Sequence, residues 1–301
     1  SLFVQRTTAA SGFDDYAAID AIMNETGVQM GDRAAVVSTR DYNSQAGGLA
    51  NGASQYQART YGNPISDEAL RRASVGVIAG IDTYKSDIVP RITAAAGVGV
   101  TISTLAAAGN YWVPKATTVA ATGETSNVDN RFQVVTVNTT TNVKAGDSFT
   151  IQDVENVHMI TKQGTGQLKT FKVVAVNSGT TMTITPPIVS NQGGSDSEAQ
   201  YQNCNVTAGA GKTVTFLNKQ TAFANPFWYK DSLEIIPGRY AVPTNAGAGI
   251  MAETTAQGFQ VVMQKFYDIN TMQVKYRVDI LFGVANKQPE MTGIIMYNQS
   301  P

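Results

Sequence analysis

The chain changes character twice along its length, and this pattern constrains its fold more than any single motif. Residues 1–114 mix helical and strand-like segments, and residues 115–222 are Thr-rich and strand-like throughout. Residues 223–301 then return to long strands and to turns that contain Pro and aromatic residues. We therefore predict an α+β scaffold, formed by residues 1–114 and 223–301, that carries residues 115–222 as an inserted domain.

The first part carries separate helix and strand signals. In Asp14–Thr26, apolar residues such as Tyr16 and Ile19 recur at helical spacing, and Gly27 can end the helix. Asp41–Asn63 is rich in Gly, Asn and Gln, which predicts an irregular surface segment. The other predicted elements of this part are the strands Arg33–Ser38 and Gly80–Pro90 and the helix Ser66–Ser74.

The segment Ile92–Ala108 connects the first part to the middle part. It is small and apolar and contains Gly, but it lacks a G-x-G-x-x-G pattern and is too short to span a membrane. We interpret it as a flexible or closely packed connection.

The middle part predicts a small antiparallel barrel or sandwich. Turn-forming residues at Lys144–Asp147, Gly164–Gly166 and Asn177–Gly179 separate short runs of β-branched and aromatic residues. Six strands are predicted: Arg131–Asn138, Ser148–Asp153, Val157–Lys162, Leu168–Val176, Thr180–Thr185 and Thr213–Leu217.

The last part contains the longest predicted strand pair. Phe259–Tyr267 and Gln273–Ala285 are joined by Asp268–Met272. In the second strand, polar residues alternate with the apolar residues Val274, Tyr276, Val278, Ile280 and Phe282. This alternation predicts a half-buried strand with one polar face left free for solvent or a neighbour.

Composition argues against several classes of function. The net charge is −1 and no cluster of Lys and Arg occurs, so the chain lacks the electrostatic footprint of a nucleic-acid-binding protein. No apolar run reaches the length of a membrane-spanning helix, about 18 residues, and no signal peptide is visible. The sequence opens on Ser1 rather than Met, which suggests processing, truncation or a fragment.

Candidate catalytic and ligand-binding residues are few. With His158 as the single histidine and Cys204 as the single cysteine, neither a typical zinc site nor an internal disulfide can form. Gly209–Thr213 resembles the end of a phosphate-binding loop, but Val206 replaces the required Gly and a strand is predicted to follow. We predict no enzyme activity, no cofactor and no metal, and we expect His158 and Cys204 to be structural.

The acidic residues are also better explained by helix starts and a solvated loop than by catalysis or metal binding. The pairs Asp14/Asp15 and Asp67/Glu68 lie at predicted helix starts, where negative charge is favourable. The segment Gly193–Glu198 lacks the alternating oxygen ligands of an EF-hand loop, so we interpret it as a solvated loop.

Three segments resemble one known family. Phe259–Ile295 resembles the closing part of Hong Kong 97-type phage major capsid proteins, in which a strand pair ends in an apolar-Gly-x-Ala stretch and then Pro, here Phe282–Ala285 and Pro289. Asn225–Pro243 is similar to the segment before that hairpin in coat proteins of short-tailed phages. Lys144–Val176 resembles the inserted β-barrel of those coat proteins, with a K-x-G-D strand opening followed by an F-x-V-x-x-V strand.

The resemblance implies a Hong Kong 97-type capsid fold, with peripheral and axial domains and an inserted small antiparallel β-barrel. It implies a major capsid protein that self-assembles into the icosahedral head of a tailed double-stranded DNA bacteriophage and encloses DNA without sequence-specific binding. Other subunits are the expected partners, with a scaffolding protein and a portal during assembly in the host cytoplasm. The family's N-terminal arm, extended loop and spine helix have no counterpart here, so we expect either that the chain is a fragment or that the part before Ser1 is separate or removed.

The resemblance also suggests one contact between subunits and one hinge. A loop of the inserted domain can reach a neighbouring subunit in this family, and Thr122–Arg131 is the candidate here. Its Glu124, Asp129 and Arg131 are either salt-bridge partners of that neighbour or part of a solvated turn. In a shell that expands, Ile92–Ala108 is a candidate hinge.

A binding module is the alternative function. A β-rich phage tail protein or an adhesin-type carbohydrate binder would use the Thr-rich middle part as its ligand site and would be a monomer or small oligomer. It would expose aromatic residues there, whereas Phe132, Phe149 and Phe171 lie within predicted strands and suggest core positions.

Overall fold

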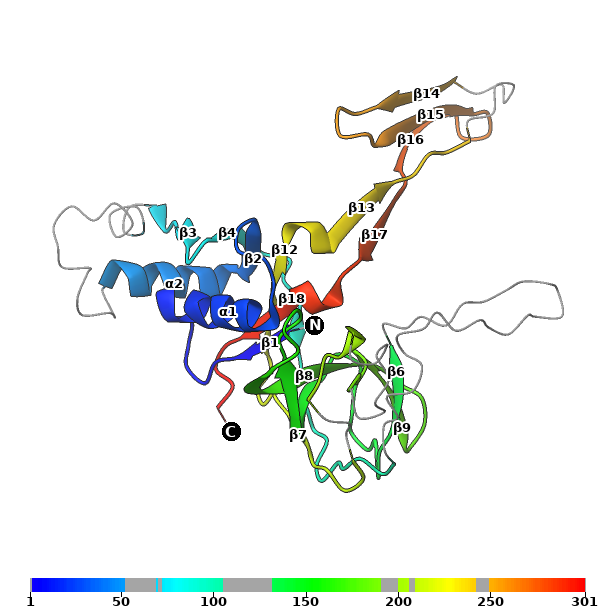
Figure 1. The fold of residues 1–301 in the computed structure, drawn as a ribbon. Coiled ribbons are helices and arrows are strands. Elements are labelled where there is room, and N and C mark those ends of the chain that lie inside the picture. Colours follow the sequence, from blue (N-terminus) through cyan, green and yellow to red (C-terminus); the bar gives the residue numbers. More distant parts are fainter. Residues whose placement is uncertain are drawn as a thin grey trace. The chain divides into compact units, whose positions relative to one another are not determined.

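The computed structural model describes residues 2–51, 69, 72–104, 132–190, 200–205, 209–241 and 249–300 (Figure 1). The chain divides into two compact units. The larger unit comprises Ser1–Lys230 with Pro289–Pro301, and the smaller unit comprises Asp231–Gln288. Within the described residues, most of the regular structure is strand and few helices occur.

The larger unit is organised around a six-stranded sheet that both ends of the chain build. Its order is β1 (Leu2–Gln5), β18 (Thr292–Met296), β12 (Asn225–Tyr229), β2 (Arg33–Ser38), β4 (Ile81–Ser86) and β3 (Val77–Ile78). The pairs β1–β18 and β2–β4 are parallel, and the other pairs are antiparallel. Strands from before and after the middle part of the chain therefore alternate within one sheet.

The strand predictions for the first part are confirmed. Strand β2 has the predicted bounds, and β4 lies within the predicted strand Gly80–Pro90. Of the predicted helix Ser66–Ser74, the structure describes Ala69 and residues 72–74, and both Ala69 and Arg72 are helical.

Helix α1 (Phe13–Thr26) confirms the first predicted helix. Asp15 stabilises its start, because the carboxylate accepts the backbone N–H groups of Ser11 and Gly12 at 2.7 and 3.1 Å. Gly27 ends the helix in the left-handed conformation, with φ of 87°, as predicted for a Gly at this position. Asp15 therefore serves the helix start and not acid–base chemistry.

Helix α2 (Thr39–Asn51) corrects the prediction of an irregular segment over Asp41–Asn63. Gly, Asn and Gln have modest helix propensity, but one side of the helix is buried through Tyr42, Gln45 and Ala46. Gly48 allows the close approach of α2 to the loop before α1, since a Cβ there would lie 2.1 Å from the Ser11 backbone oxygen. Tertiary packing thus overrides local propensity, and residues 52–63 lie outside the described residues.

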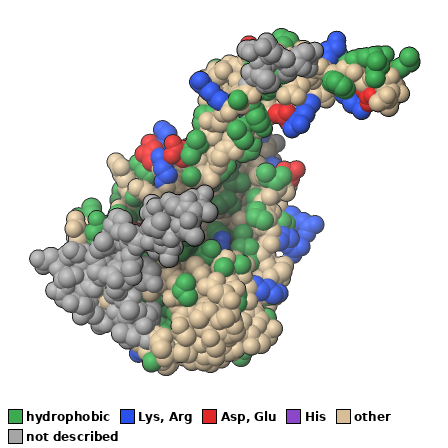
Figure 2. Space-filling view, turned by 90° about the vertical axis from the view of Figure 1, so that its right-hand side faces the viewer, with side chains coloured by type: hydrophobic (Ala, Val, Ile, Leu, Met, Phe, Trp, Pro, Cys, Tyr) green, Lys and Arg blue, Asp and Glu red, His purple; other side chains and the backbone are tan. Residues whose placement is uncertain are grey.

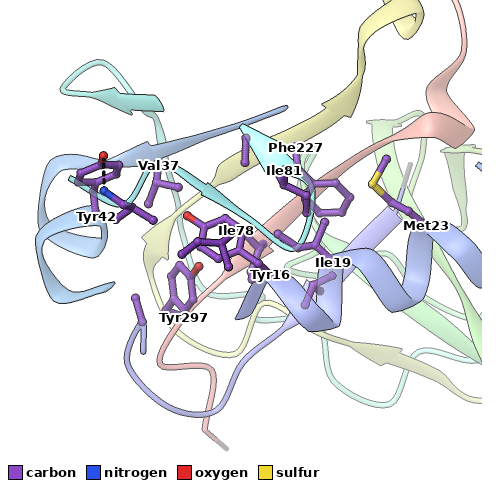
Figure 3. Close-up of a cluster of buried hydrophobic side chains, with 14 of the residues drawn as sticks. Tyr16, Ile19, Met23, Val37, Tyr42, Ile78, Ile81, Phe227 and Tyr297 are labelled. Atoms are coloured by element: carbon purple, nitrogen blue, oxygen red, sulfur yellow. Dashed lines mark hydrogen bonds between the residues drawn. The ribbon is translucent and has the colours of Figure 1, made fainter. Parts of the chain in front are cut away.

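The core between the two helices and the six-stranded sheet is mostly apolar (Figure 3), and Gln45 links two of its tyrosines. The hydroxyl of Tyr16 donates to the Gln45 side-chain oxygen at 2.8 Å, and the Gln45 amide donates to the Tyr297 hydroxyl at 2.7 Å. Burial raises the pKa of both phenols above its usual value. This link joins α1, α2 and the segment after β18.

A second, five-stranded sheet of the larger unit uses residues between these elements. Its order is β10 (Val214–Phe216), β7 (Ser148–Val157), β8 (Gly164–Val176), β9 (Thr181–Thr185) and β6 (Gln133–Thr136). The segment Val100–Ser103 joins its two edges through the bridges Thr101–Thr213 and Ile102–Val137. We call these strands with Val100–Ser103 the closed sheet.

The interior of the closed sheet is aromatic and tightly packed. Phe149 lies 5.6 Å from Phe171 and 6.1 Å from Phe216 between ring centroids. A Cβ on Gly97 would lie 2.7 Å from the Phe216 ring. Phe149 and Phe171 are therefore core residues, as predicted, and the described part of Ile92–Ala108 is a closely packed connection.

Two details of the middle part differ from prediction. Val157–Lys162 is not a separate strand, because β7 continues through Asp153, which has a positive φ of 63°, and ends at Val157. The predicted turn at Gly164–Gly166 lies inside β8. The turns at Lys144–Asp147 and Asn177–Gly179 are confirmed, so five strands replace the six predicted ones.

The smaller unit contains two sheets. β13 (Leu233–Pro237) pairs with β17 (Phe282–Asn286), and β14 (Gly249–Thr254), β15 (Gln260–Asp268) and β16 (Gln273–Ile280) form a three-stranded sheet. The predicted hairpin is confirmed as β15–β16. The predicted long strand Gln273–Ala285 is broken at Leu281, because its two parts pair with different strands.

The packing of α2 predicts opposite effects for two adjacent glycines. Gly48→Ala is expected to destabilise the protein by about 2 kcal/mol, because the Cβ would overlap the Ser11 backbone oxygen. Gly47→Ala is the matched control: its Cβ would meet nothing within 4 Å, and Ala favours a helix interior by about 0.5–1 kcal/mol. Urea unfolding followed by circular dichroism measures both, and equal effects would contradict the described packing.

Candidate functional site

The residues singled out from the sequence that the structure describes lie in separate turns, strands and helix starts. No group of three or more His, Cys, Asp or Glu side chains among the described residues could hold a metal ion. His158 lies in the turn between β7 and β8, and Cys204 is buried beside β7. Lys212, in the glycine-rich segment, forms an ion pair with Asp153. The predicted contact residues Glu124, Asp129 and Arg131 lie outside the described residues, as do Asp67, Glu68 and Gly193–Glu198.

The three-stranded sheet of the smaller unit exposes an apolar face. Directly opposite residues in neighbouring strands share a face, so Tyr267, Met263 and Met251 lie on the face of Val274 and Val278. Tyr276 and Ile280 also belong to this set, which we call the apolar face. Two charged residues, Lys265 opposite Tyr276 and Glu253 on β14, lie on the same face, and the Lys265 ammonium is 5.8 Å from the centre of the Tyr276 ring. Hydrophobic side chains are visible at the surface in the upper part of Figure 2.

The apolar face contradicts the prediction of a half-buried strand. Tyr276 is 62% exposed, Val278 61% and Phe282, on the next strand, 58%. Alternation correctly predicted that Val274, Tyr276, Val278 and Ile280 share a face, but Phe282 lies in β17, which pairs with β13 in a separate sheet. No element of the described chain covers the apolar face. A contiguous exposed apolar patch of this kind is typical of an interaction surface.

The opposite face of β16 is charged. Lys275 forms an ion pair with Asp268 at 2.7 Å, and Arg277 forms one with Asp279 at 2.7 Å. The hydrogen bond from Lys275 lowers the pKa of Asp268. Exposed pairs of this kind contribute little to stability. Phe266, which is 61% exposed, lies opposite Lys275 on the same face of the sheet, so that face is charged along β16 but not polar throughout.

A polar contact in the larger unit connects the closed sheet to α1. The Lys169 ammonium, on a residue only 6% exposed, donates to the Asn156 side-chain oxygen at 3.2 Å. The Asn156 amide donates to the Thr26 hydroxyl at 3.4 Å, and that hydroxyl donates to the Ile22 carbonyl at 2.5 Å. These hydrogen bonds form one directed chain from β8 through β7 to α1.

The β7–β8 turn contacts the same helix end. The Met159 backbone N–H donates to the Thr26 carbonyl at 3.3 Å. A Cβ on Gly27 would lie 3.2 Å from the Met159 Cβ and 3.4 Å from the His158 ring, so Gly27 allows the turn to approach closely. We call this region, Thr26, Gly27, Asn156, His158, Met159 and Lys169, the junction. A small cavity beside it is lined partly by Leu2, Glu25 and Glu290.

The features described so far indicate a class of protein. The described residues combine a strand-rich scaffold, a closed sheet and an exposed apolar face, which suits a protein that works by association. Residues 1–298 match a family model described as "P22 coat protein - gene protein 5". The chain therefore belongs to the P22 coat protein family and is a phage major capsid protein, as predicted.

A solved structure is also similar in sequence. The CUS-3 coat protein I-domain is 33% identical to this chain, covering 41% of this chain and 99% of that chain, with a TM-score of 0.28. The family match favours the capsid function over the binding-module alternative. None of the described helices has both the length and the apolar character needed to cross a membrane.

The junction predicts a specific loss of stability when the Thr26 hydroxyl is removed. Thr26→Val keeps the shape of the side chain but deprives the buried Asn156 amide of its acceptor, which is expected to cost about 1–3 kcal/mol. Thr26→Ser retains the hydroxyl and should cost clearly less. Chemical unfolding of the three proteins measures the difference, and equal losses in the two variants would argue that methyl packing dominates at this position.

Cys204 is predicted to be unreactive in the folded protein. Burial raises the pKa of its thiol to about 11, from an ordinary value of 9.0. A thiol reagent such as Ellman's reagent should therefore react at pH 8 only after unfolding. The same shift predicts that stability falls as the pH rises from about 9 to about 11, because only the unfolded thiol ionises there. Rapid labelling of the native protein would contradict the buried placement.

Proposed function

We propose that this coat protein assembles in many copies into the icosahedral head of a tailed double-stranded DNA phage. The observation that carries this proposal is the exposed apolar face in a member of a coat protein family. Burial of apolar surface contributes about 25 cal/mol per Å², and contacts that are weak singly become strong when symmetry repeats them. Neighbouring subunits in the shell cover this face.

The proposed architecture is a Hong Kong 97-type scaffold with an inserted β-barrel, divided into residues 1–114, 115–222 and 223–301. Its support is the pairing of β12 with β2 and of β18 with β1, since the scaffold sheet then draws on both sides of the insert. The closed sheet supplies the barrel, and Val100–Ser103 adds residues from before position 115.

The proposed partners are other subunits, a scaffolding protein and a portal, with assembly in the host cytoplasm. The net charge of −1 gives no basis for strong electrostatic binding to the DNA backbone, which fits a shell that encloses DNA rather than binding it tightly. Glu124, Asp129 and Arg131 remain proposed contacts with a neighbouring subunit.

Two charge insertions on opposite faces of β16 test the proposal. Val278→Lys places a cation on the apolar face and should abolish shells or reduce their yield at least about tenfold, because covering that face would bury an unpaired charge. Gln273→Lys adds the same charge to the polar face of the same strand and should assemble normally. Negative-stain electron microscopy and sedimentation measure shell yield. Because Val278 and Gln273 are both exposed, neither change should lower the thermal midpoint by more than a few degrees.

The outcomes separate the proposal from a general folding defect. Normal shells from Val278→Lys would show that the apolar face is not an assembly contact. If the wild-type coat protein forms only monomers or small oligomers under conditions that support coat assembly, the proposal of a self-assembling head subunit fails.

A further inference from the structure

The turn between β7 and β8 depends on an uncharged histidine side chain. The Nδ1 atom of His158 accepts the backbone N–H groups of Ile160 and Thr161, each at 3.2 Å. A side-chain acceptor that bonds to the N–H groups two and three residues later is the pattern by which Asn and Asp stabilise turns. Because both partners are donors, Nδ1 must carry a lone pair and the ring hydrogen must lie on Nε2.

The turn held in this way is the part of the closed sheet that contacts the end of α1. The next residue, Met159, donates its N–H to the Thr26 carbonyl at 3.3 Å. The outer edge of the His158 ring, Cε1 and Nε2, faces Gly27 at the helix end. The geometry of one imidazole therefore affects both the turn and its contact with α1.

Protonation would change both contacts. A proton on Nδ1 would face two N–H donors, so both hydrogen bonds of the turn would be lost. The charged residues on the elements that meet here are Glu25 on α1, Lys162 in the turn, Lys169 on β8 and Glu290 after β17.

We propose that His158 is a pH-sensitive latch between the closed sheet and α1. When neutral, the imidazole holds the turn in the form that donates to Thr26; when protonated, it releases the turn and loosens the junction. An ordinary imidazole titrates between about pH 5 and pH 8. The contact therefore requires a neutral imidazole and is lost when Nδ1 takes up a proton. This inference concerns the subunit itself and does not depend on the proposed shell.

Hydrogen exchange followed by NMR on the unassembled subunit tests the latch. Between about pH 7.5 and about pH 5, protection factors of the Met159, Ile160 and Thr161 amides should fall about tenfold or more. The Val173 amide, which donates to the Asp147 carbonyl within the closed sheet, should keep its protection and so exclude global unfolding.

Three variants separate His158 from other sources of pH dependence. His158→Asn supplies a side-chain oxygen for the same turn and does not titrate, so its protection should not change with pH. His158→Ala should lack protection at both pH values. Glu25→Gln should behave as the wild type. The latch is wrong if wild-type protection is independent of pH, if His158→Asn loses it on acidification, if His158→Ala retains it, or if Glu25→Gln removes the pH dependence.

Discussion

The backbone hydrogen bonds that β12 makes on both of its edges hold the larger unit together. β12 follows the closed sheet in sequence, yet it pairs with β2 on one side and β18 on the other. Asn225 at its start reinforces this position, since it accepts the Ser38 N–H at 2.8 Å and donates to Asp41 at 2.9 Å. Gly293 on β18 is required opposite it, because a Cβ there would lie 2.2 Å from the Phe227 ring. The six-stranded sheet therefore stays continuous although the residues of the closed sheet lie between its strands in sequence.

Sequence patterns predicted the elements whose determinants are local. α1, β2 and the β15–β16 hairpin have caps, turns or periodicity within their own residues. α2 was missed because its stability comes from packing: the Gly that lowers its propensity permits its contact with Ser11. Alternation in β16 identified the apolar face correctly, but it could not say whether another part of the chain covers that face.

The same distinction applies to the candidate sites. His158 was noticed because it is the single histidine, but its role depends on Gly27 and Thr26, which are more than a hundred residues away in sequence. Lys169 and Asn156 carry no sequence signal beyond their polarity within a strand pattern. Short hydrogen-bonded chains between distant segments become visible only when the fold places their members together.

The pairing of β1 with β18 has a consequence for biosynthesis. Residues of the closed sheet leave the ribosome well before β18, so this sheet can fold while the scaffold is still incomplete. β1, although made before the closed sheet, must wait for β18 before its parallel partner exists. Such long-range pairing forms slowly. An interrupted chain would therefore carry a folded closed sheet beside an incomplete six-stranded sheet, and translation itself would delay completion of the larger unit.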